Sequence, residues 1–316
     1  MRKAGIFLVV AALLAGMVGC PPAGPEPVYF ADANLEAVIR EAIDQPTGDI
    51  YPEDLAQLTA LTAEKMDISD LTGLEYATGL TMLRLSRNQI TDISPLEGLT
   101  NLTVLDLHDN QISDISPLEG LTNLRFLSLG EGLGGNQISD VSPLAGLTNL
   151  TDLWLAINQI SDISPLAGLT KLTSLSLQHN QISDISPLEG MTGLRSLVLD
   201  VNQISDISPL EGLTNLTWLY LSRNQISDVS PLQGLTGLIR LDLNYNQIGD
   251  ISSLEGLTSL TDLLLGWNQI SDIEPLVDNV GLGAGDQVTL AGNPLSEQSI
   301  NEYIPALKAR GVSVRY

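Results

Sequence analysis

The fold is decided by the stretch Leu102-Thr-Val-Leu105-Asp-Leu107-His-Asp-Asn110-Gln-Ile112-Ser-Asp-Ile115-Ser-Pro-Leu118-Glu-Gly-Leu121, which is one copy of a unit that repeats down the chain. The unit begins at about Leu80 and contains the motif Asn-Gln-Ile-x-Asp. Its marker asparagine recurs every 22 residues, with a single step of 26, at Asn88, Asn110, Asn136, Asn158, Asn180, Asn202, Asn224, Asn246 and Asn268. A unit this short cannot bury its own apolar face, so the period predicts a solenoid of stacked copies.

Each unit combines an alternating apolar pattern with a buried turn. Leu105 and Leu107 alternate with polar residues, which indicates a short strand with one buried face. Asn110 falls where the chain must turn inward, and its amide offers donors and an acceptor to turn backbone groups. We therefore expect the marker asparagines, together with Asn293 at the end of the array, to form a structural row inside the molecule.

The second half of the unit predicts a helical turn. Ser116-Pro117 is a helical start signal, with Ser as the cap and Pro at the first helical position. Few residues remain before the next strand, so the turn is expected to be a short 3₁₀ turn. The interior behind it is expected to be lined by Ile112, Ile115, Leu118 and Leu121.

The repeated pattern resembles the leucine-rich repeat family, in particular the 22-residue class of bacterial internalins and of eukaryotic phosphatase-regulating proteins. The match covers residues 61–295. The resemblance implies an α/β fold, a curved horseshoe-shaped solenoid with a parallel sheet on its concave face and short 3₁₀ or helical turns on its convex face.

The segments before and after the array are expected to cap it, because an open solenoid end exposes core and an unpaired strand edge. Residues 28–79 are predicted to form the N-terminal cap, which includes a degenerate first repeat around Leu61. Asp32 is expected to cap a helix reaching about Ile43, and Pro52 to open a second helix reaching about Leu58.

Nine repeats are assigned to residues 80–276, with a four-residue insertion at about 130–135. Residues 277–316 are assigned to the last repeat and the C-terminal cap. In that cap, Ser296 is expected to start a helix that runs to about Ala309 and ends at Gly311. Residues 312–316 are expected to add a last edge strand.

The first 19 residues are predicted to be a lipoprotein signal peptide. Arg2 and Lys3 precede an apolar run that is too short to span a bilayer comfortably. Met17-Val18-Gly19-Cys20 resembles a bacterial lipobox, which makes Cys20 the expected site of lipidation; the alternative is an ordinary secretion signal with an incidental cysteine. Residues 20–27 are expected to act as a Pro-rich tether.

The charge balance excludes one class of partner. The 316-residue chain has a formal net charge of −24, whereas nucleic-acid binding needs clustered Lys and Arg. The nine aspartates of Asn-Gln-Ile-x-Asp are expected to bond the N–H groups of the turns, although calcium binding is an alternative. Neither a catalytic group nor a phosphate-binding loop is recognised, and no metal site or cofactor is predicted.

Recognition is expected on the concave face, where positions differ from one repeat to the next. All three tryptophans fall there, together with Phe126, Tyr220, Tyr245, His108 and His179. In a parallel sheet, equivalent residues stand about 4.8 Å apart in neighbouring repeats. One row should therefore bring Arg223, Tyr245 and Trp267 together, and another Trp218, Arg240 and Asp262, the latter as a cation–π contact beside an ion pair.

We predict a partner-binding patch in the last three full repeats, because exposed Trp, Tyr and Arg dominate binding hot spots. Its residues are Trp218, Tyr220, Arg223, Arg240, Tyr245 and Trp267, and Trp154 is a separate candidate. The alternative is that these side chains merely pack against one another.

Three functions fit this pattern. The first is a non-enzymatic module that binds a protein or glycan and is lipid-anchored in the bacterial envelope, at the cell surface or the outer membrane. The second is a structural or assembly component of the envelope, favoured by the near-identity of the repeats. The third is an intracellular phosphatase-regulating protein, which the signal-like N-terminus disfavours.

Overall fold

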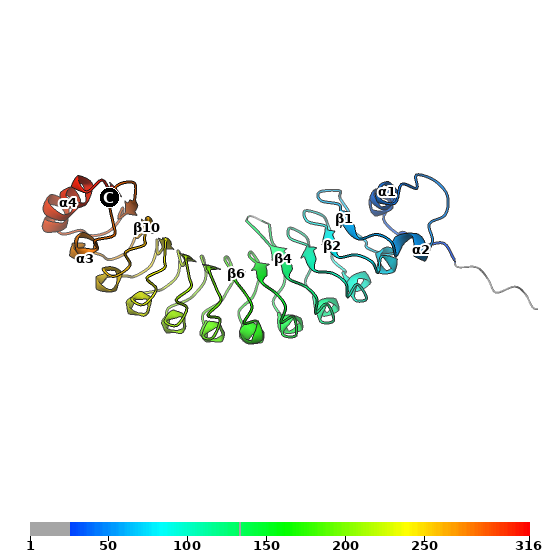
Figure 1. Cartoon of the computed structure of the whole chain (residues 1–316), viewed down its shortest axis with the longest axis horizontal. Coiled ribbons are helices and arrows are strands. Elements are labelled where there is room, and N and C mark those ends of the chain that lie inside the picture. The colour runs from blue at the N-terminus through cyan, green and yellow to red at the C-terminus, as the bar shows by residue number, and fades with distance from the viewer. Residues whose placement is uncertain (1–25, 133) are drawn as a thin grey trace, which may run out of the picture.

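The computed structural model describes residues 26–132 and 134–316, so the expected signal peptide and Cys20 lie outside the described residues. The described chain forms one parallel sheet of 12 strands that follow one another in sequence order. Figure 1 shows a curved solenoid with the strands along its inner side and the short turns along its outer side. The predicted α/β repeat solenoid is confirmed. The strands are β1 (Ala60–Thr62), β2 (Met82–Arg84), β3 (Val104–Asp106), β4 (Phe126–Gly130), β5 (Asp152–Leu155), β6 (Ser174–Ser176), β7 (Ser196–Val198), β8 (Trp218–Tyr220), β9 (Arg240–Asp242), β10 (Asp262–Leu264), β11 (Gln287–Thr289) and β12 (Ser313–Arg315).

The sheet register follows the repeat, so each unit places the same residue type at the same point. Leu83, Leu105 and Leu127 pair in turn along β2, β3 and β4, and all three are fully buried. The core is a continuous column of such leucines and isoleucines from the N-terminal to the C-terminal cap. Each repeat therefore buries its apolar face only against its neighbours.

The convex side is made of 3₁₀ turns, most with the sequence Ser-Pro-Leu. Their start differs from the prediction, because Ser116 is the first residue of its turn rather than the cap. Its N–H donates to Asp114 Oδ1 at 2.9 Å, so the aspartate two residues earlier forms an Asx turn that leads into the 3₁₀ turn. The turns are η1 (Leu74–Tyr76), η2 (Ser94–Leu96), η3 (Ser116–Leu118), η4 (Ser142–Leu144), η5 (Ser164–Gly168), η6 (Ser186–Leu188), η7 (Ser208–Leu210), η8 (Ser230–Leu232) and η9 (Ser252–Leu254).

The marker asparagines join each repeat to the one before it. The Nδ2 of Asn180 donates to the carbonyls of Leu155 and Leu177, both at 3.0 Å. Its Oδ1 accepts the N–H of Ile160 at 3.0 Å. The same pattern recurs to Asn293, whose amide bonds three backbone groups. One side chain thus satisfies buried polar groups of two neighbouring turns.

The residue before most marker asparagines adopts a left-handed backbone. Examples are Val201 with a φ of 56° and Trp267 with a φ of 55°. This conformation is uncommon for residues other than glycine and sterically unfavourable for a β-branched side chain such as valine. It turns the chain sharply after each strand, and the asparagine bonds hold that turn.

The 26-residue step produces a hairpin on the strand side of the solenoid. β4 continues to Gly130, and Glu131 and Gly134 form an antiparallel bridge. A Cβ on Gly135 would lie 1.6 Å from the carbonyl oxygen of Ile157, so only glycine fits there. The insertion is packed tightly against the next repeat.

The N-terminal cap contains α1 (Ala33–Ala42) and α2 (Pro52–Leu55). Asp32 caps α1 as expected, since its Oδ1 accepts the N–H groups of Asn34 and Leu35. The second helix is shorter than predicted and ends at Leu55 rather than Leu58. Ala56 and Gln57 form a turn instead, which leads directly toward β1.

The C-terminal end contains α3 (Glu274–Asp278), which replaces the 3₁₀ turn of the last repeat, followed by η10 (Ser299–Tyr303), a π-helical turn, and α4 (Ile304–Ala309). Ser296 Oγ accepts the N–H of Ser299 at 3.1 Å. Gly311, with a φ of 90°, leads from α4 to β12. Among the described residues, no helix combines the length and apolar character needed to cross a membrane.

Candidate functional site on the concave face

The row of residues just before the marker asparagines forms an aromatic stack near the C-terminal end. The rings of Tyr245 and Trp267 are parallel within 5°, with centroids 4.5 Å apart. The guanidinium carbon of Arg223 lies 4.3 Å from the centroid of Tyr245. Gly292 continues the row, and a Cβ there would lie 2.7 Å from the Trp267 ring. We call Arg223, Tyr245 and Trp267 the stacked row.

The stacked row is exposed although its members touch one another. Tyr245 is 38% exposed and Trp267 is 48% exposed, and Arg223 is exposed as well. Because the three side chains come from consecutive repeats, Arg223 and Trp267 cover opposite faces of the Tyr245 ring. The stacked row therefore presents ring edges and polar groups to solvent rather than open ring faces.

The neighbouring row differs from the prediction in its contacts. Trp218, Arg240 and Asp262 do lie in register on β8, β9 and β10. However, the cation–π contact of Arg240 is with Tyr220, at 5.5 Å, and not with Trp218. Within residues 26–132 and 134–316, Arg240 and Asp262 form no ion pair.

Register and the charge of Asp242 give a physical reason for the contact of Arg240 with Tyr220. Asp242 lies two residues beyond Arg240 on the same face of β9, and the Arg240 charge acts to lower the Asp242 pKa. Asp242 stands in register with Tyr220, so attraction toward Asp242 favours the position of the Arg240 guanidinium over the Tyr220 ring, although no ion pair joins Arg240 to Asp242 among the described residues. Trp218 is left 49% exposed beside it.

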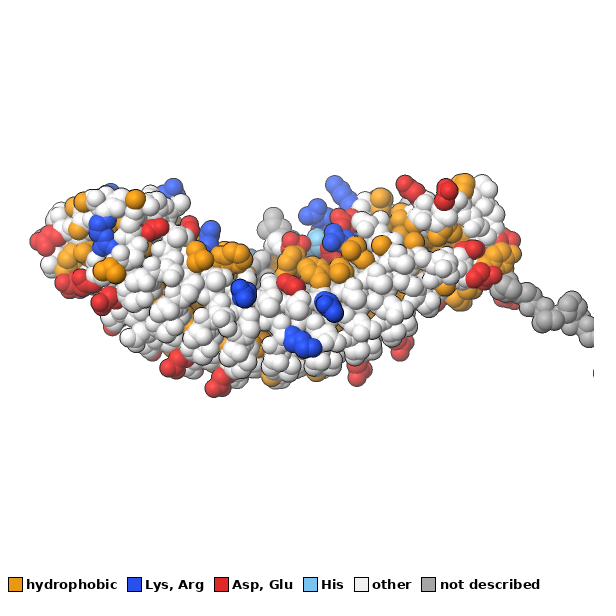
Figure 2. Space-filling view, viewed as in Figure 1, with side chains coloured by type: hydrophobic (Ala, Val, Ile, Leu, Met, Phe, Trp, Pro, Cys, Tyr) orange, Lys and Arg blue, Asp and Glu red, His pale blue; other side chains and the backbone are white. Residues whose placement is uncertain are grey.

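The separate candidate Trp154 has a different environment. Its ring packs edge-on against Phe126 on the neighbouring strand, with centroids 4.9 Å apart and planes at 77°. Trp154 and Phe126 are both partly buried. This pair lies in the N-terminal half of the concave face, away from the stacked row, and the hydrophobic side chains that Figure 2 shows along the inner side fall in separate groups.

Two carboxylates on the concave face were not singled out from the sequence. Burial, and to a smaller extent the nearby charge of Asp242, raise the pKa of Asp200 to about 6, against the lowering effect of the hydrogen bond from Ser222. Burial also raises the pKa of Asp242. Both shifts depend on how neighbouring side chains exclude water, for which the repeat carries no signal.

A buried acid–histidine pair was also missed. His108 adjoins Asp109 in sequence, but its Nδ1 lies 2.8 Å from Asp106 Oδ1, one place back on the same face of the strand. His108 is only 8% exposed. The hydrogen bond to Asp106 is the main cause that raises the His108 pKa. His179, by contrast, is exposed.

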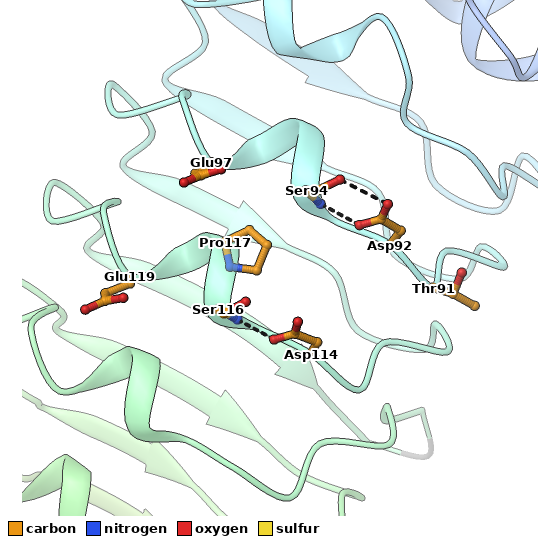
Figure 3. A pocket seen from close by; sticks show the side chains of 8 residues that line it. All are labelled: Thr91, Asp92, Ser94, Glu97, Asp114, Ser116, Pro117 and Glu119. Atoms are coloured by element: carbon orange, nitrogen blue, oxygen red, sulfur yellow. Dashed lines mark hydrogen bonds between the residues drawn. The ribbon is translucent and has the colours of Figure 1, made fainter.

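The convex aspartates bond to the turns that follow them. Figure 3 shows Asp92 and Asp114 reaching Ser94 and Ser116 at the edge of a groove of about 580 Å³ between two turns. The bond from the Ser116 N–H lowers the pKa of Asp114. Equivalent bonds are made by Asp140, Asp162, Asp184, Asp206, Asp228, Asp250 and Asp272. In the part of the chain that the structure describes, no three His, Cys, Asp or Glu side chains are grouped to hold a metal.

Comparison with known proteins identifies the family. A model described as Leucine Rich repeats (2 copies) matches residues 78–120, 100–132, 122–168, 170–212, 214–256 and 236–278. The chain belongs to the leucine-rich repeat family. No match to this leucine-rich repeat protein is found among curated proteins.

Solved structures show which leucine-rich repeat proteins it is similar to. An internalin (inlF) of Listeria monocytogenes is 35% identical with a TM-score of 0.62, over 90% of this chain and 95% of that one. Internalin C2 of the same organism is 43% identical with a TM-score of 0.63, over 66% of this chain and 92% of that one. The plant peptide hormone receptor RGFR1, solved in complex with RGF2, shares the fold at 20% identity with a TM-score of 0.60, over 78% of this chain and 46% of that one.

Proposed function

We propose that this leucine-rich repeat protein is a non-enzymatic binding module of a bacterial cell envelope, which recognises a protein partner on its concave face. The observation that carries the proposal is the exposed stacked row, together with the exposed Trp218 on the same concave face. Large aromatic and arginine side chains held in fixed positions lose little conformational freedom on binding and dominate interface energetics. Its similarity to internalins supports an adhesion-like role.

The geometry favours a protein over a glycan as partner. A sugar ring packs its C–H groups against an open aromatic face, and in the stacked row both faces of Tyr245 are covered by Arg223 and Trp267, which leaves Trp218 as the exposed ring outside the stack. The exposed edges, the indole N–H and the guanidinium suit the mixed apolar and polar surface of a protein. The partly buried Asp200 and Asp242 add hydrogen-bond acceptors beside the row.

Replacing Trp218, Tyr245 and Trp267 together by Ala should abolish partner recognition without unfolding the chain, since none of the three belongs to the core. The purified chain would be incubated with bacterial and host cells, and bound protein measured by flow cytometry. Binding should fall at least about tenfold. The melting temperature should stay close to that of the parent chain.

The matched control replaces Glu97, Glu119 and Glu211 on the convex side by Ala and should leave binding intact. Treating the cells with trypsin should remove binding, whereas glycosidase treatment should not. Undiminished binding by the aromatic triple variant would contradict the proposed surface, and loss after glycosidase alone would make the partner a glycan.

We also propose that acylated Cys20 anchors the protein to the envelope membrane. The support is the sequence Met17-Val18-Gly19-Cys20 after an apolar run, which resembles a lipobox. Several acyl chains on one cysteine would hold the protein firmly, since two lipid signals already suffice for stable anchoring.

A further inference from the structure

The insertion hairpin forms one side of a half-open cavity on the concave side, in the N-terminal half of the solenoid. The cavity has a volume of about 280 Å³ and is lined by Arg87, His108, Asp109, Glu131, Gly132 and Gly134. A Cβ on Gly134 would lie 2.5 Å from the Asp109 side chain, so the hairpin is seated directly on the preceding repeat. The cavity wall is therefore a product of the single irregular step in the repeat.

The buried histidine in this wall has one nitrogen engaged and one free for a ligand. His108 Nδ1 faces Asp106 at 2.8 Å, and an ionised carboxylate can only accept, so Nδ1 carries the proton. In the neutral ring Nε2 is then an acceptor. No described residue bonds to Nε2, and it is not among the side-chain atoms sealed from solvent without a partner. His108 lines the cavity, and Nε2 is its ring nitrogen that remains accessible to a ligand.

The charges around the cavity favour a cation. Glu131 Oε2 lies 3.7 Å from His108 Nδ1. With Asp106 and Asp109 it brings three carboxylates to the region, against one guanidinium from Arg87. A neutral His108 leaves this set with a net negative charge. Its free acceptors match a group rich in N–H donors.

We propose that this cavity is a second binding site, which takes a guanidinium or ammonium group such as the side chain of Arg or Lys on a protein ligand. The ligand group donates to His108 Nε2 and to the carboxylates of Glu131 and Asp109. The site is separate from the stacked row and does not depend on the function proposed for it.

Binding of a cation here is linked to pH. A protonated His108 cannot accept a hydrogen bond at Nε2 and repels a cation, so the ligand competes with the proton. The charged groups that face His108 are Asp106 and Glu131, which favour its protonation, and Arg87, which opposes it. Affinity should therefore rise as the pH increases through the His108 pKa.

The test is an NMR titration of the purified chain with methylguanidinium chloride. The chain has two histidines, and the exposed His179 serves as an internal reference. The Cε1–H signal of His108 should shift in a saturable way, and its pKa should fall in the presence of the ligand. Sodium acetate at equal ionic strength should have no such effect.

Glu131→Gln should weaken the binding of methylguanidinium about tenfold, because it removes one charged hydrogen-bond acceptor. Glu131 has a side chain that is 49% exposed, so the substitution should leave folding intact. The matched control, Glu119→Gln on the convex side, should bind like the parent chain. Equal shifts of both histidines, a response to acetate instead, or unchanged affinity in Glu131→Gln would each overturn the proposal.

Discussion

On the concave face, burial makes the ionised form of the Asp200 carboxyl group unfavourable. Its Oδ1 accepts the N–H of Ser222 at 2.7 Å, yet burial raises its pKa from 3.8 to about 6. A carboxyl whose pKa is higher in the folded than in the unfolded chain binds its proton more tightly when folded. Its contribution to stability is therefore present below about pH 4 and is lost as the pH rises to about 6.

Asp200→Asn should stabilise the protein at pH 7, because the amide oxygen can keep the Ser222 bond while the buried charge is removed. A pKa shift of this size corresponds to up to about 3 kcal/mol in the free energy of unfolding. Urea unfolding at pH 7 should show the gain, and at pH 4 the gain should vanish. An equal gain at both pH values would mean that ionisation is not the cause.

Asp206 provides the opposite case for comparison. It is exposed on the convex side, and the bond from the Ser208 N–H lowers its pKa. Its contribution to stability is therefore present at neutral pH and is lost as the pH falls through the folded pKa. Asp206→Asn should bring no stabilisation at pH 7.

At the scale of the element, the turns and strands of one repeat are held by the next. The asparagine row crosses each boundary between repeats, and the convex aspartates act only within a turn. The period of 22 predicts both the asparagine row and the convex aspartates, because a residue type that recurs in every unit makes the same hydrogen bonds in every unit. The length of α2 was predicted less well, because no repeat constrains residues 52–58.

Asn180→Leu should destabilise the protein by about 1–3 kcal/mol, because it leaves buried backbone groups without partners. The groups are the carbonyls of Leu155 and Leu177 and the N–H of Ile160. Asn215→Leu is the control, since its exposed amide donates only to the Thr192 carbonyl. Urea unfolding measures the free energy of unfolding of both variants. Equal stability of the two would contradict this role of Asn180.

At the scale of the whole molecule, the solenoid separates its two candidate sites along one face. The His108 cavity and Arg223 lie five repeats apart, which is roughly 24 Å at the spacing of parallel strands. A protein partner of ordinary size can span that distance.

The proposed lipid anchor at Cys20 belongs to this scale, because an anchored end would set which way the concave face is presented. The parent protein should sediment with membranes and be released by detergent, whereas Cys20→Ser should appear in the soluble fraction. Protease added to intact cells should digest the parent protein if it is displayed on the surface. Retention of Cys20→Ser in membranes would contradict the anchor, and protection from protease would favour an assembly role inside the envelope.

The sequence by itself determined the solenoid, the parallel sheet and the neighbours within each concave row. The step of 22, which is constant from Asn136 to Asn268, sets the register, and register alone brings Arg223, Tyr245 and Trp267 side by side. Only the tertiary structure decided that Arg240 contacts Tyr220. The reason is that side chains choose among diagonal neighbours by local charge and space, which a period does not encode.

The tertiary structure alone also decided the pairing of His108 with Asp106 and the burial of Asp200. Both depend on how much water the surrounding side chains exclude, and in the first case on a hairpin that interrupts the repeat. Periodic positions can be read from the sequence because every copy repeats the same contacts. The His108 cavity lies at the insertion that interrupts the period, so no other repeat contains the same contacts from which it could be predicted.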